Sequence, residues 1–341
     1  MAARVERPNL RVPRERPRFT RARSVIVTGL ACSLAATLAC SKKREEPAKA
    51  APSASATAAL AVASPPAEPH FRQPLAFSAY TATLAADDEA VYVLTSRGAY
   101  RYGNDGAAAT WELELGDTPA LGSSGIAYWR DGALRRAPLK GGPELVLATV
   151  PQPPRRLSAS GERLVWEEHA SGASVLRTLS GAEPRTLHHA QGSIEALTLM
   201  DDQAYFVESE QEEWRVGVVP LGGGAARFTP PRSSRSPAML AASGDVFFYD
   251  GPTSSVRRLA SDLSREQVVG RDMICSPLAV GEEVYCAQIS LIFALPRDGG
   301  RARLLAPKRP GTLAAVTTTG KRVAWLLDVG DDRAELEVWS R

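Results

Sequence analysis

A pattern that returns seven times between Leu84 and the C-terminus is the strongest constraint on the fold of this chain. Each copy has a short apolar segment, a small polar turn and a segment rich in aromatic residues, as in the first copy, Leu84–Val93. Equivalent apolar positions, spaced 35 to 42 residues apart, are Val91, Ile126, Leu164, Ala204, Val246, Val284 and Val323. A period near forty with several short strands per repeat is typical of β-propeller blades.

The rest of each repeat contains two more strand-like segments joined by a glycine-rich turn, such as Gly141-Gly142 in the second copy. Glycine favours such hairpin turns because it reaches positive φ without steric cost. The last copy has only three strand-like segments, and a spare one, Leu75–Tyr80, precedes the first copy. We therefore predict an all-β fold: a single β-propeller of seven four-stranded blades, with the N-terminal strand closing the last blade. Six or eight blades, or a solenoid of stacked repeats, are the alternatives.

The segment 127–142, AYWRDGALRRAPLKGG, resembles the propellers with a Tyr-Trp-Thr-Asp signature and related bacterial propeller lipoproteins. In those proteins an aromatic strand precedes a Gly-x-Leu/Val-x-Arg strand and a Gly-Gly turn. The other copies keep this pattern loosely, and the full four-residue signature is absent. The resemblance covers Leu84 to the C-terminus and implies the fold; it implies no activity, because propellers have many unrelated functions.

The N-terminal residues have the parts of a secretory signal. An arginine-rich segment precedes the uncharged run Ser24–Ala39, which ends in small residues, and this order is typical of a signal peptide. Leu38 to Ser41 resembles the lipobox of bacterial lipoproteins, in which Cys40 is lipidated, although Thr37 stands where the family prefers leucine. We predict a lipoprotein-type signal peptide over 1–39 and attachment to a membrane of the bacterial envelope, on the outer-membrane or periplasmic side. Plain secretion and an uncleaved anchor are the alternatives.

The segment 40–72 is rich in alanine, proline and serine. Such a composition cannot bury a hydrophobic core, so we predict a disordered tether here. The propeller domain is then expected over 73–341.

The charge of the chain argues against a nucleic-acid partner. The formal net charge is +3, and residues 1–39 hold eight arginines and two glutamates, so their removal leaves −3. A mildly acidic protein lacks the basic surface of a nucleic-acid binder. We expect a monomeric propeller that meets the membrane only through its N-terminal lipid.

Two cysteines remain in the propeller segment, Cys275 and Cys286. They lie on either side of the turn at 280–283, and a disulfide between them is expected in an oxidising compartment. A reduced, buried pair is the alternative, because bridging needs a specific geometry.

The histidines give no sign of a metal site or a cofactor. His188 and His189 are adjacent, so on a strand they would point to opposite faces, and His70 and His169 stand alone. We predict no metal and no cofactor; the haem-attachment and Gly-x-Ser-x-Gly nucleophile motifs are absent from the sequence.

The predicted inner strands are small and apolar, but the loops entering them are basic. Their candidate binding residues are Arg155, Arg156, Arg232, Arg235, Arg271, Lys308 and Arg309. The segments after the aromatic strands are acidic, and their acidic residues are Glu167, Glu168, Glu208, Glu210, Glu212, Glu213, Asp328, Asp331 and Asp332. We expect an inner basic ring inside an outer acidic ring, and a partner that is an envelope protein or an anionic ligand, such as an acidic peptide or a glycan. Ordinary solvated surface charge is the alternative.

These patterns predict a binding or scaffold module rather than an enzyme. The alternative is a divergent propeller hydrolase or lyase with its site on the loop-bearing face. Convergence of Glu167, Glu168 and His169 in a concave pocket would favour that alternative. A structural component of an envelope assembly is a third class.

Overall fold

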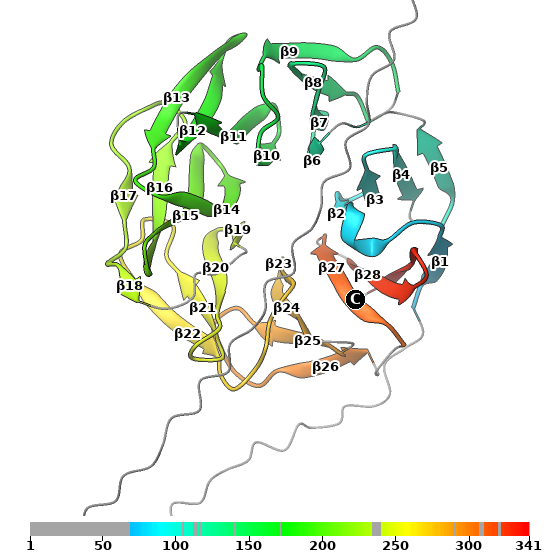
Figure 1. Ribbon diagram of the computed structural model, residues 1–341. Coiled ribbons are helices and arrows are strands. Elements are labelled where there is room, and N and C mark those ends of the chain that lie inside the picture. Colours follow the sequence, from blue (N-terminus) through cyan, green and yellow to red (C-terminus); the bar gives the residue numbers. More distant parts are fainter. Residues whose placement is uncertain are drawn as a thin grey trace, which may run out of the picture. The chain divides into compact units, whose positions relative to one another are not determined.

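The computed structural model arranges the strands as small antiparallel sheets in a ring around one axis (Figure 1). It describes residues 69–103, 106–111, 115, 117–139, 141–170, 172–233, 240–288, 291–306, 310–319 and 322–340. All of them belong to one of the two units into which the chain divides, Thr57–Arg341. Within the described ranges there are seven sheets, and their inner strands contact each other in sequence around the ring. The predicted seven-bladed β-propeller is confirmed.

Each blade is an antiparallel meander that runs outward from the axis. The inner strands are β2 (Ala82–Ala86), β6 (Asp117–Gly122), β10 (Arg156–Ser160), β14 (Ser193–Met200), β19 (Leu240–Ser243), β23 (Leu278–Val280) and β27 (Thr312–Thr318). The second strands are β3 (Ala90–Thr95), β7 (Gly125–Arg130), β11 (Arg163–Ala170), β15 (Gln203–Glu210), β20 (Asp245–Asp250), β24 (Glu283–Gln288) and β28 (Arg322–Gly330).

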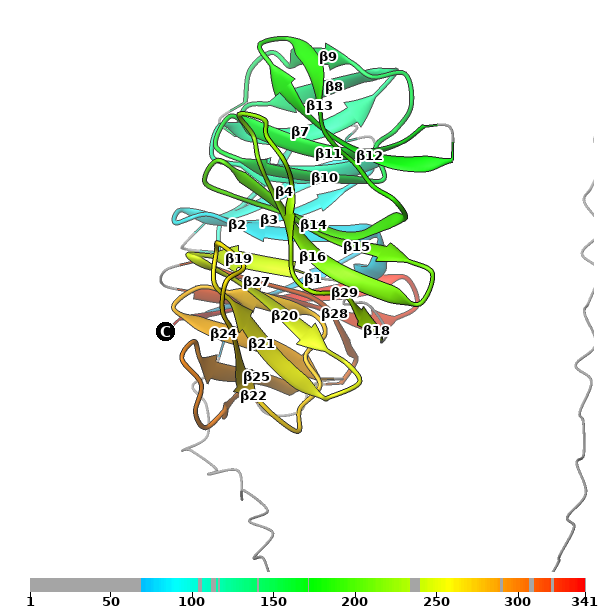
Figure 2. The ribbon, with the colours of Figure 1, turned by 90° about the vertical axis from the view of Figure 1, so that its left-hand side faces the viewer.

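The outer half of each blade completes the four strands. The third strands are β4 (Gly98–Gly103), β8 (Ala133–Ala137), β12 (Ala173–Ser180), β16 (Glu213–Pro220), β21 (Ser255–Leu259), β25 (Leu291–Pro296) and β29 (Arg333–Ser340). The outer strands are β5 (Ala108–Trp111), β9 (Leu145–Thr149), β13 (Glu183–His189), β17 (Arg227–Phe228) with β18 (Arg232–Ser233), β22 (Glu266–Gly270), β26 (Arg303–Ala306) and β1 (Phe71–Leu75). Figure 2 shows the ring from its side.

The second strands form the packing layer between blades. Tyr92, Tyr128, Trp166 and Tyr205 are almost fully buried on the second strands of the first four blades. Strands covered on both faces read as continuous apolar runs, and Ala90–Thr95 is buried along its whole length. The aromatic half of the repeat is therefore the inter-blade core.

The N-terminal strand closes the last blade, as predicted. β1 pairs with β29 in a register that runs from Phe71↔Val338 to Leu75↔Ala334. The predicted position of this strand, Leu75–Tyr80, was wrong: the strand ends at Leu75, and the short 3-10 helix η1 (Ala79–Thr81) follows. Pro74 fits an outer strand, because it has no amide hydrogen to donate and an outer strand has a neighbour on one side only.

The outer strand of the fourth blade is interrupted at Pro230 and Pro231. β17 pairs with β16 at Gly217 and Val218, and β18 pairs with the start of the same strand. A proline has no amide hydrogen to donate to a neighbouring strand, so the ladder breaks between the two short pieces.

A disulfide joins Cys275, in the loop before β23, to Cys286 in β24. The sulfur atoms of Cys275 and Cys286 are 2.05 Å apart, and both side chains are buried. Cys275 precedes β23 instead of lying on it.

Replacing Cys275 and Cys286 together by alanine is expected to lower the free energy of unfolding by about 2–3 kcal/mol, since the bridge closes a short loop. Urea unfolding of the native and doubly substituted proteins measures this difference. Equal midpoints for the two proteins in the absence of reductant would show that the bridge contributes nothing.

In the part of the chain that the structure describes, no helix is long and apolar enough to cross a membrane. The predicted signal peptide, lipidated Cys40 and most of the predicted tether lie outside the described residues.

Candidate functional site

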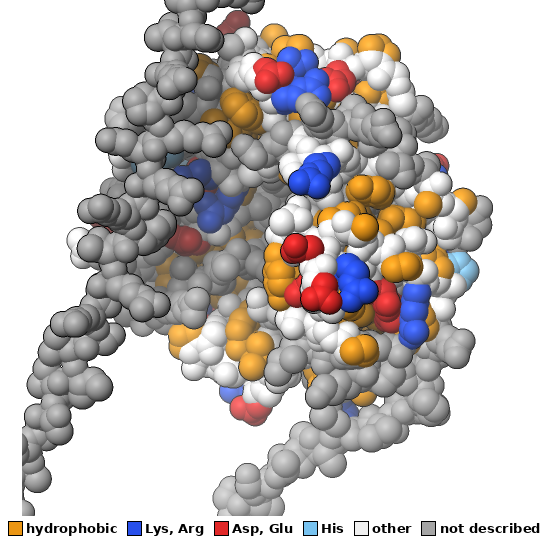
Figure 3. Space-filling model, turned by 45° about the vertical axis from the view of Figure 1, so that its right-hand side comes forward, with side chains coloured by type: hydrophobic (Ala, Val, Ile, Leu, Met, Phe, Trp, Pro, Cys, Tyr) orange, Lys and Arg blue, Asp and Glu red, His pale blue; other side chains and the backbone are white. Residues whose placement is uncertain are grey.

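A cavity of about 330 Å³ opens at the mouth of the funnel formed by the inner strands. Its lining residues, which come from the first five blades, are Thr83, Thr118, Pro119, Arg155, Arg156, Leu157, Ala196, Leu197 and Leu240. They lie at or near the starts of the inner strands. This end of the ring also carries the hairpins between second and third strands, because successive strands are antiparallel, and we call it the top face. Figure 3 shows basic and acidic side chains together within the hollow at the ring centre.

Arg156 is held in the cavity by a buried carboxylate of its own blade. It is the first residue of β10 and stands opposite Glu167 of β11. One guanidinium nitrogen of Arg156 lies 2.6 Å from Oε2 of Glu167, whose side chain is fully buried. Ser174 Oγ donates a hydrogen bond of 2.7 Å to the other oxygen of Glu167. A buried carboxylate that is itself held by Ser174 orients the guanidinium of Arg156 through a charge-assisted hydrogen bond.

Glu195 approaches Arg156 from the neighbouring blade. It is the extra residue of a β-bulge in β14, between Ile194 and Ala196, which pair with consecutive residues of β15. Its Oε2 lies 3.9 Å from the second terminal nitrogen of Arg156. Bulges redirect side chains and are frequent beside functional sites.

Thr118, on the blade next to Arg155 and Arg156, has a strained backbone. Its φ is 53°, a value that is unusual for a β-branched residue, and it lies in an irregularity of β6 between Asp117 and Ala120. Its hydroxyl donates a hydrogen bond of 3.4 Å to the carbonyl of Pro154, just before the two arginines. Strained residues cluster at ligand sites, and both β6 and β14 are irregular beside this mouth.

The structure brings only part of the predicted basic set to the funnel. Arg155, which is exposed, and Arg156 line the cavity. Arg232 lies on the outer strand of its blade, where it pairs with Glu266 and lies 5.2 Å from the ring centre of Trp214. Arg271 is exposed directly after the outer strand β22. Arg235, Lys308 and Arg309 lie outside the described residues, so an inner ring is not formed by the four described arginines.

The predicted outer acidic ring is also incomplete. Glu167 and Glu208 are buried within second strands, because β11 and β15 extend further toward the top face than the sequence pattern indicates. Glu168 pairs with Arg177 at 2.5 Å and accepts a hydrogen bond from the indole of Trp166. Glu210, Glu212 and Glu213 are exposed.

The residues that would have favoured catalysis do not converge. Glu167 and Glu168 have different partners on opposite faces of β11, and His169 is exposed. In the described ranges, no group of three or more histidine, cysteine or acidic residues could hold a metal ion.

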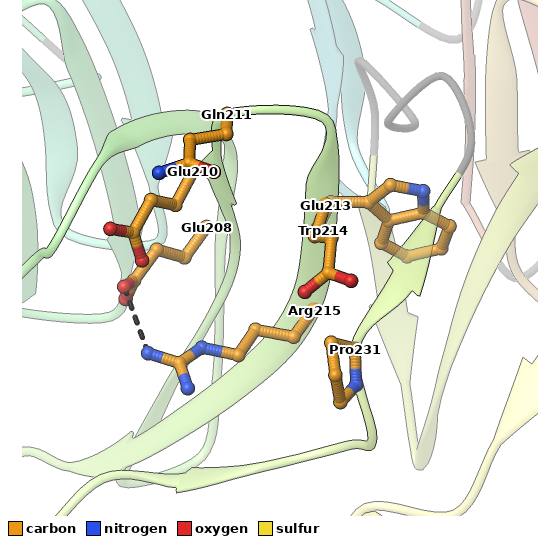
Figure 4. A pocket seen from close by; sticks show the side chains of 7 residues that line it. All are labelled: Glu208, Glu210, Gln211, Glu213, Trp214, Arg215 and Pro231. Atoms are coloured by element: carbon orange, nitrogen blue, oxygen red, sulfur yellow. Dashed lines mark hydrogen bonds and ion pairs between the residues drawn. The ribbon is translucent and has the colours of Figure 1, made fainter.

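A second hollow, of about 270 Å³, lies on the fourth blade beside the interrupted outer strand (Figure 4). Its lining residues are Glu208, Glu210, Gln211, Glu213, Trp214, Arg215 and Pro231. Glu208 is buried at its base, 2.7 Å from Nε2 of His188 on the third blade and 3.0 Å from a nitrogen of Arg215. The guanidinium of Arg215 stacks over Phe228. The contact between His188 and Glu208 links the third and fourth blades. The sequence did not predict it, because the two residues lie on different blades and no local pattern pairs them.

Glu208 is held in its charged form. Burial by itself would raise its pKa, but hydrogen bonds from His188, the Gln191 amide and Arg215 outweigh this effect and hold the pKa below the usual range of a glutamate. A lowered pKa contributes stability that is present above the unfolded-state pKa and is lost as the pH falls through the folded-state value.

Glu208→Gln is therefore expected to make the urea midpoint less dependent on pH between about 5 and 3 than it is in the native protein. Urea titrations at several pH values between 6 and 3 measure this slope. An identical slope in both proteins would exclude Glu208 as a contributor to acid sensitivity.

Comparisons with solved structures agree with the fold. A chain in a crystal structure of the mitotic checkpoint complex matches with a TM-score of 0.58 and 10% identity, over 80% of this chain and 95% of that one. Virginiamycin B lyase from Staphylococcus aureus, in a catalytically inactive form with quinupristin, matches with a TM-score of 0.53 and 13% identity, over 78% and 98%.

PorZ, a surface component of the type-IX secretion system of Porphyromonas gingivalis, matches with a TM-score of 0.52 and 12% identity. The match covers 79% of this chain but 39% of PorZ, so this chain spans less than half of that protein. No protein-family model and no curated protein matches the chain. At these identities the likeness shows the β-propeller fold alone.

Proposed function

We propose that this chain is a lipid-anchored binding or scaffold module of the bacterial envelope, and that the mouth of its funnel binds an anionic group of a protein partner. The observation that carries this proposal is the placement of Arg155 and Arg156 together in the 330 Å³ cavity. Planar guanidinium groups bind carboxylates and other oxyanions through paired hydrogen bonds.

The two arginines have complementary properties. Arg155 is exposed and accessible to a ligand, whereas Arg156 is oriented in advance by Glu167. The remaining lining residues are threonine, proline, leucine and alanine, and an apolar wall strengthens a charge interaction by lowering the local dielectric. A pre-oriented cation in a partly apolar hollow favours an anionic ligand group.

Exposed apolar side chains on the same face support a protein as the partner. Tyr80 and Ile274 lie on connections that enter inner strands, and Val329 lies at the hairpin end of β28. All three are therefore on the top face. Protein interfaces combine apolar and aromatic contacts with arginine.

The envelope part of the proposal is supported by the sequence, through the uncharged run Ser24–Ala39 and the lipobox-like residues up to Ser41. Labelling the full-length chain with a radioactive fatty acid in a bacterial host tests it. Label incorporation that is lost in Cys40→Ala is expected, and a chain that remains unlabelled would contradict the lipid anchor.

The binding part is tested by co-purification of the intact anchored chain from membranes. Arg155→Glu is expected to abolish recovery of the partner that accompanies the native chain. Arg265→Glu is the matched control, because Arg265 is exposed in the loop before β22, on the opposite face. Arg156 is left in place because its removal would leave Glu167 buried without its ion pair. Recovery of the same partner with Arg155→Glu would show that the funnel mouth is not the binding site.

A further inference from the structure

We infer that the mouth of the funnel selects a single carboxylate group over a phosphate group, and that Glu195 sets this selectivity. The ligand class is then an acidic side chain or a free chain terminus of a peptide. This inference rests on the proposed function, because it takes the mouth as the binding site.

One terminal nitrogen of Arg156 remains open to a ligand. The first is committed to Glu167 at 2.6 Å. The second lies 3.9 Å from Glu195, which is too long for a hydrogen bond. Glu195 instead accepts a hydrogen bond of 2.5 Å from the hydroxyl of Ser193 through its other oxygen. About a third of each side chain is exposed, 32% for Arg156 and 34% for Glu195, so a small oxyanion can reach this nitrogen.

The charges around this nitrogen limit how much negative charge a ligand bound there can carry. In the described part of the mouth, the positive charges of Arg155 and Arg156 are balanced by Glu167 and Glu195. A carboxylate adds one negative charge to this neutral set, whereas a phosphate monoester adds nearly two. Because Coulomb energies scale with ligand charge, Glu195 repels the dianion about twice as strongly as the monoanion and cancels the extra attraction of the arginines for it. The larger desolvation cost of the dianion is then left without compensation.

The β-bulge in β14 places Glu195 beside Arg156 and leaves it outside the strand pairing. Ile194 and Ala196, on either side, are buried and pair with β15. Glu195 is the unpaired residue between them, so its side chain can be replaced without removing a ladder contact. Glu195→Gln keeps the shape of the side chain and removes its charge.

The test is a calorimetric titration of three acetylated alanine-based pentapeptides into the intact chain. The first has a central glutamate and an amidated end, the second a central phosphoserine and an amidated end, and the third a free C-terminal carboxylate with no acidic side chain. We expect the native chain to bind a carboxylate peptide more tightly than the phosphoserine peptide. The tighter of the first and third peptides identifies the carboxylate source.

Glu195→Gln is expected to raise the affinity for the phosphoserine peptide about tenfold and that for the carboxylate peptides about threefold, by Coulomb's law over roughly 6 Å in water. Glu183→Gln, which makes the same charge change at an exposed position at the start of β13, is the matched control and should change neither affinity.

The outcomes separate this inference from the proposed function. If carboxylate binding is unaffected by Arg155→Gln, or if no peptide binds, the proposed function fails. If carboxylate binding depends on Arg155 but Glu195→Gln leaves the ratio of the two affinities unchanged, only the selectivity role of Glu195 is wrong. A native chain that prefers the phosphoserine peptide overturns the inference directly.

Discussion

Replacing Glu337 by alanine is expected to lower the free energy of unfolding by about 3–5 kcal/mol, because it removes the acceptor of two buried indole hydrogen bonds, at about 1–3 kcal/mol each, together with one ion pair. Glu337 is fully buried in the last blade, and its Oε1 lies 2.8 Å from Nε of Arg72 on the closing strand. Its other oxygen accepts hydrogen bonds from the indole nitrogens of Trp325, at 3.0 Å, and Trp339, at 3.3 Å. The substitution removes both of these hydrogen bonds from the core.

The effect is large because this carboxylate joins the two ends of the ring. Arg72 belongs to β1 and Glu337 to β29, and the pair spans the seam where the chain closes on itself. Arg72→Ala is also expected to lower the free energy of unfolding, because it leaves the fully buried Glu337 without its ion pair; the two indole hydrogen bonds to Glu337 remain in this variant.

Urea unfolding followed by tryptophan fluorescence measures both substitutions. Glu183→Ala, at an exposed position of β13, is the control and should change the free energy of unfolding by less than about 0.5 kcal/mol. A loss of less than about 1 kcal/mol for Glu337→Ala would mean that the seam does not depend on this carboxylate.

Replacing Gly192 by alanine is the second substitution with a large expected effect, a loss of about 3 kcal/mol. An added Cβ at Gly192 would lie 2.0 Å from the carbonyl oxygen of Ser209 and 2.8 Å from its carbon. Both are backbone atoms of β15, so neither can rotate away as a side chain could. The strand itself must shift, beside the Glu208 cluster and the bulge that carries Glu195.

Gly222→Ala in the same blade is the matched control. Gly222 has an ordinary φ, and an added Cβ there would meet nothing within 4 Å, so this substitution should be neutral or slightly stabilising. Comparing urea midpoints of the two variants isolates the steric term. Equal midpoints would show that the backbone at Gly192 relaxes without cost.

The sequence was sufficient to predict the propeller because its repeat reports local structure. Each copy carries its own turn chemistry and its own buried aromatic segment, and the spacing of residues such as Val91 and Val246 counts the blades. The closing strand followed from counting strands in the last copy. Its predicted position was wrong because Phe71 and Arg72 stand directly after the Ala/Pro/Ser-rich segment and no local pattern marks them as a strand. Only their pairing with β29 does so.

The site was less predictable because it depends on contacts between blades. Arg156 and Glu167 are neighbours through strand register, but Glu195 and His188 reach their partners across a blade boundary, which no local pattern encodes. Arg232 follows Pro230 and Pro231, whose break in the ladder keeps it on the outer strand and away from the funnel. The sequence therefore identified the charged residues but did not predict where the fold places the described ones, which do not form two rings.

The most direct test of the funnel mouth as the binding site is the arginine side-chain nitrogen NMR spectrum during titration with the acetylated, amidated glutamate peptide. The Nε–Hε signals of Arg155 and Arg156 are predicted to shift together and to saturate, while those of Arg232 and Arg258, which are paired on outer parts of their blades, stay unchanged. A spectrum in which the Arg155 and Arg156 signals do not move at saturating peptide would contradict the account.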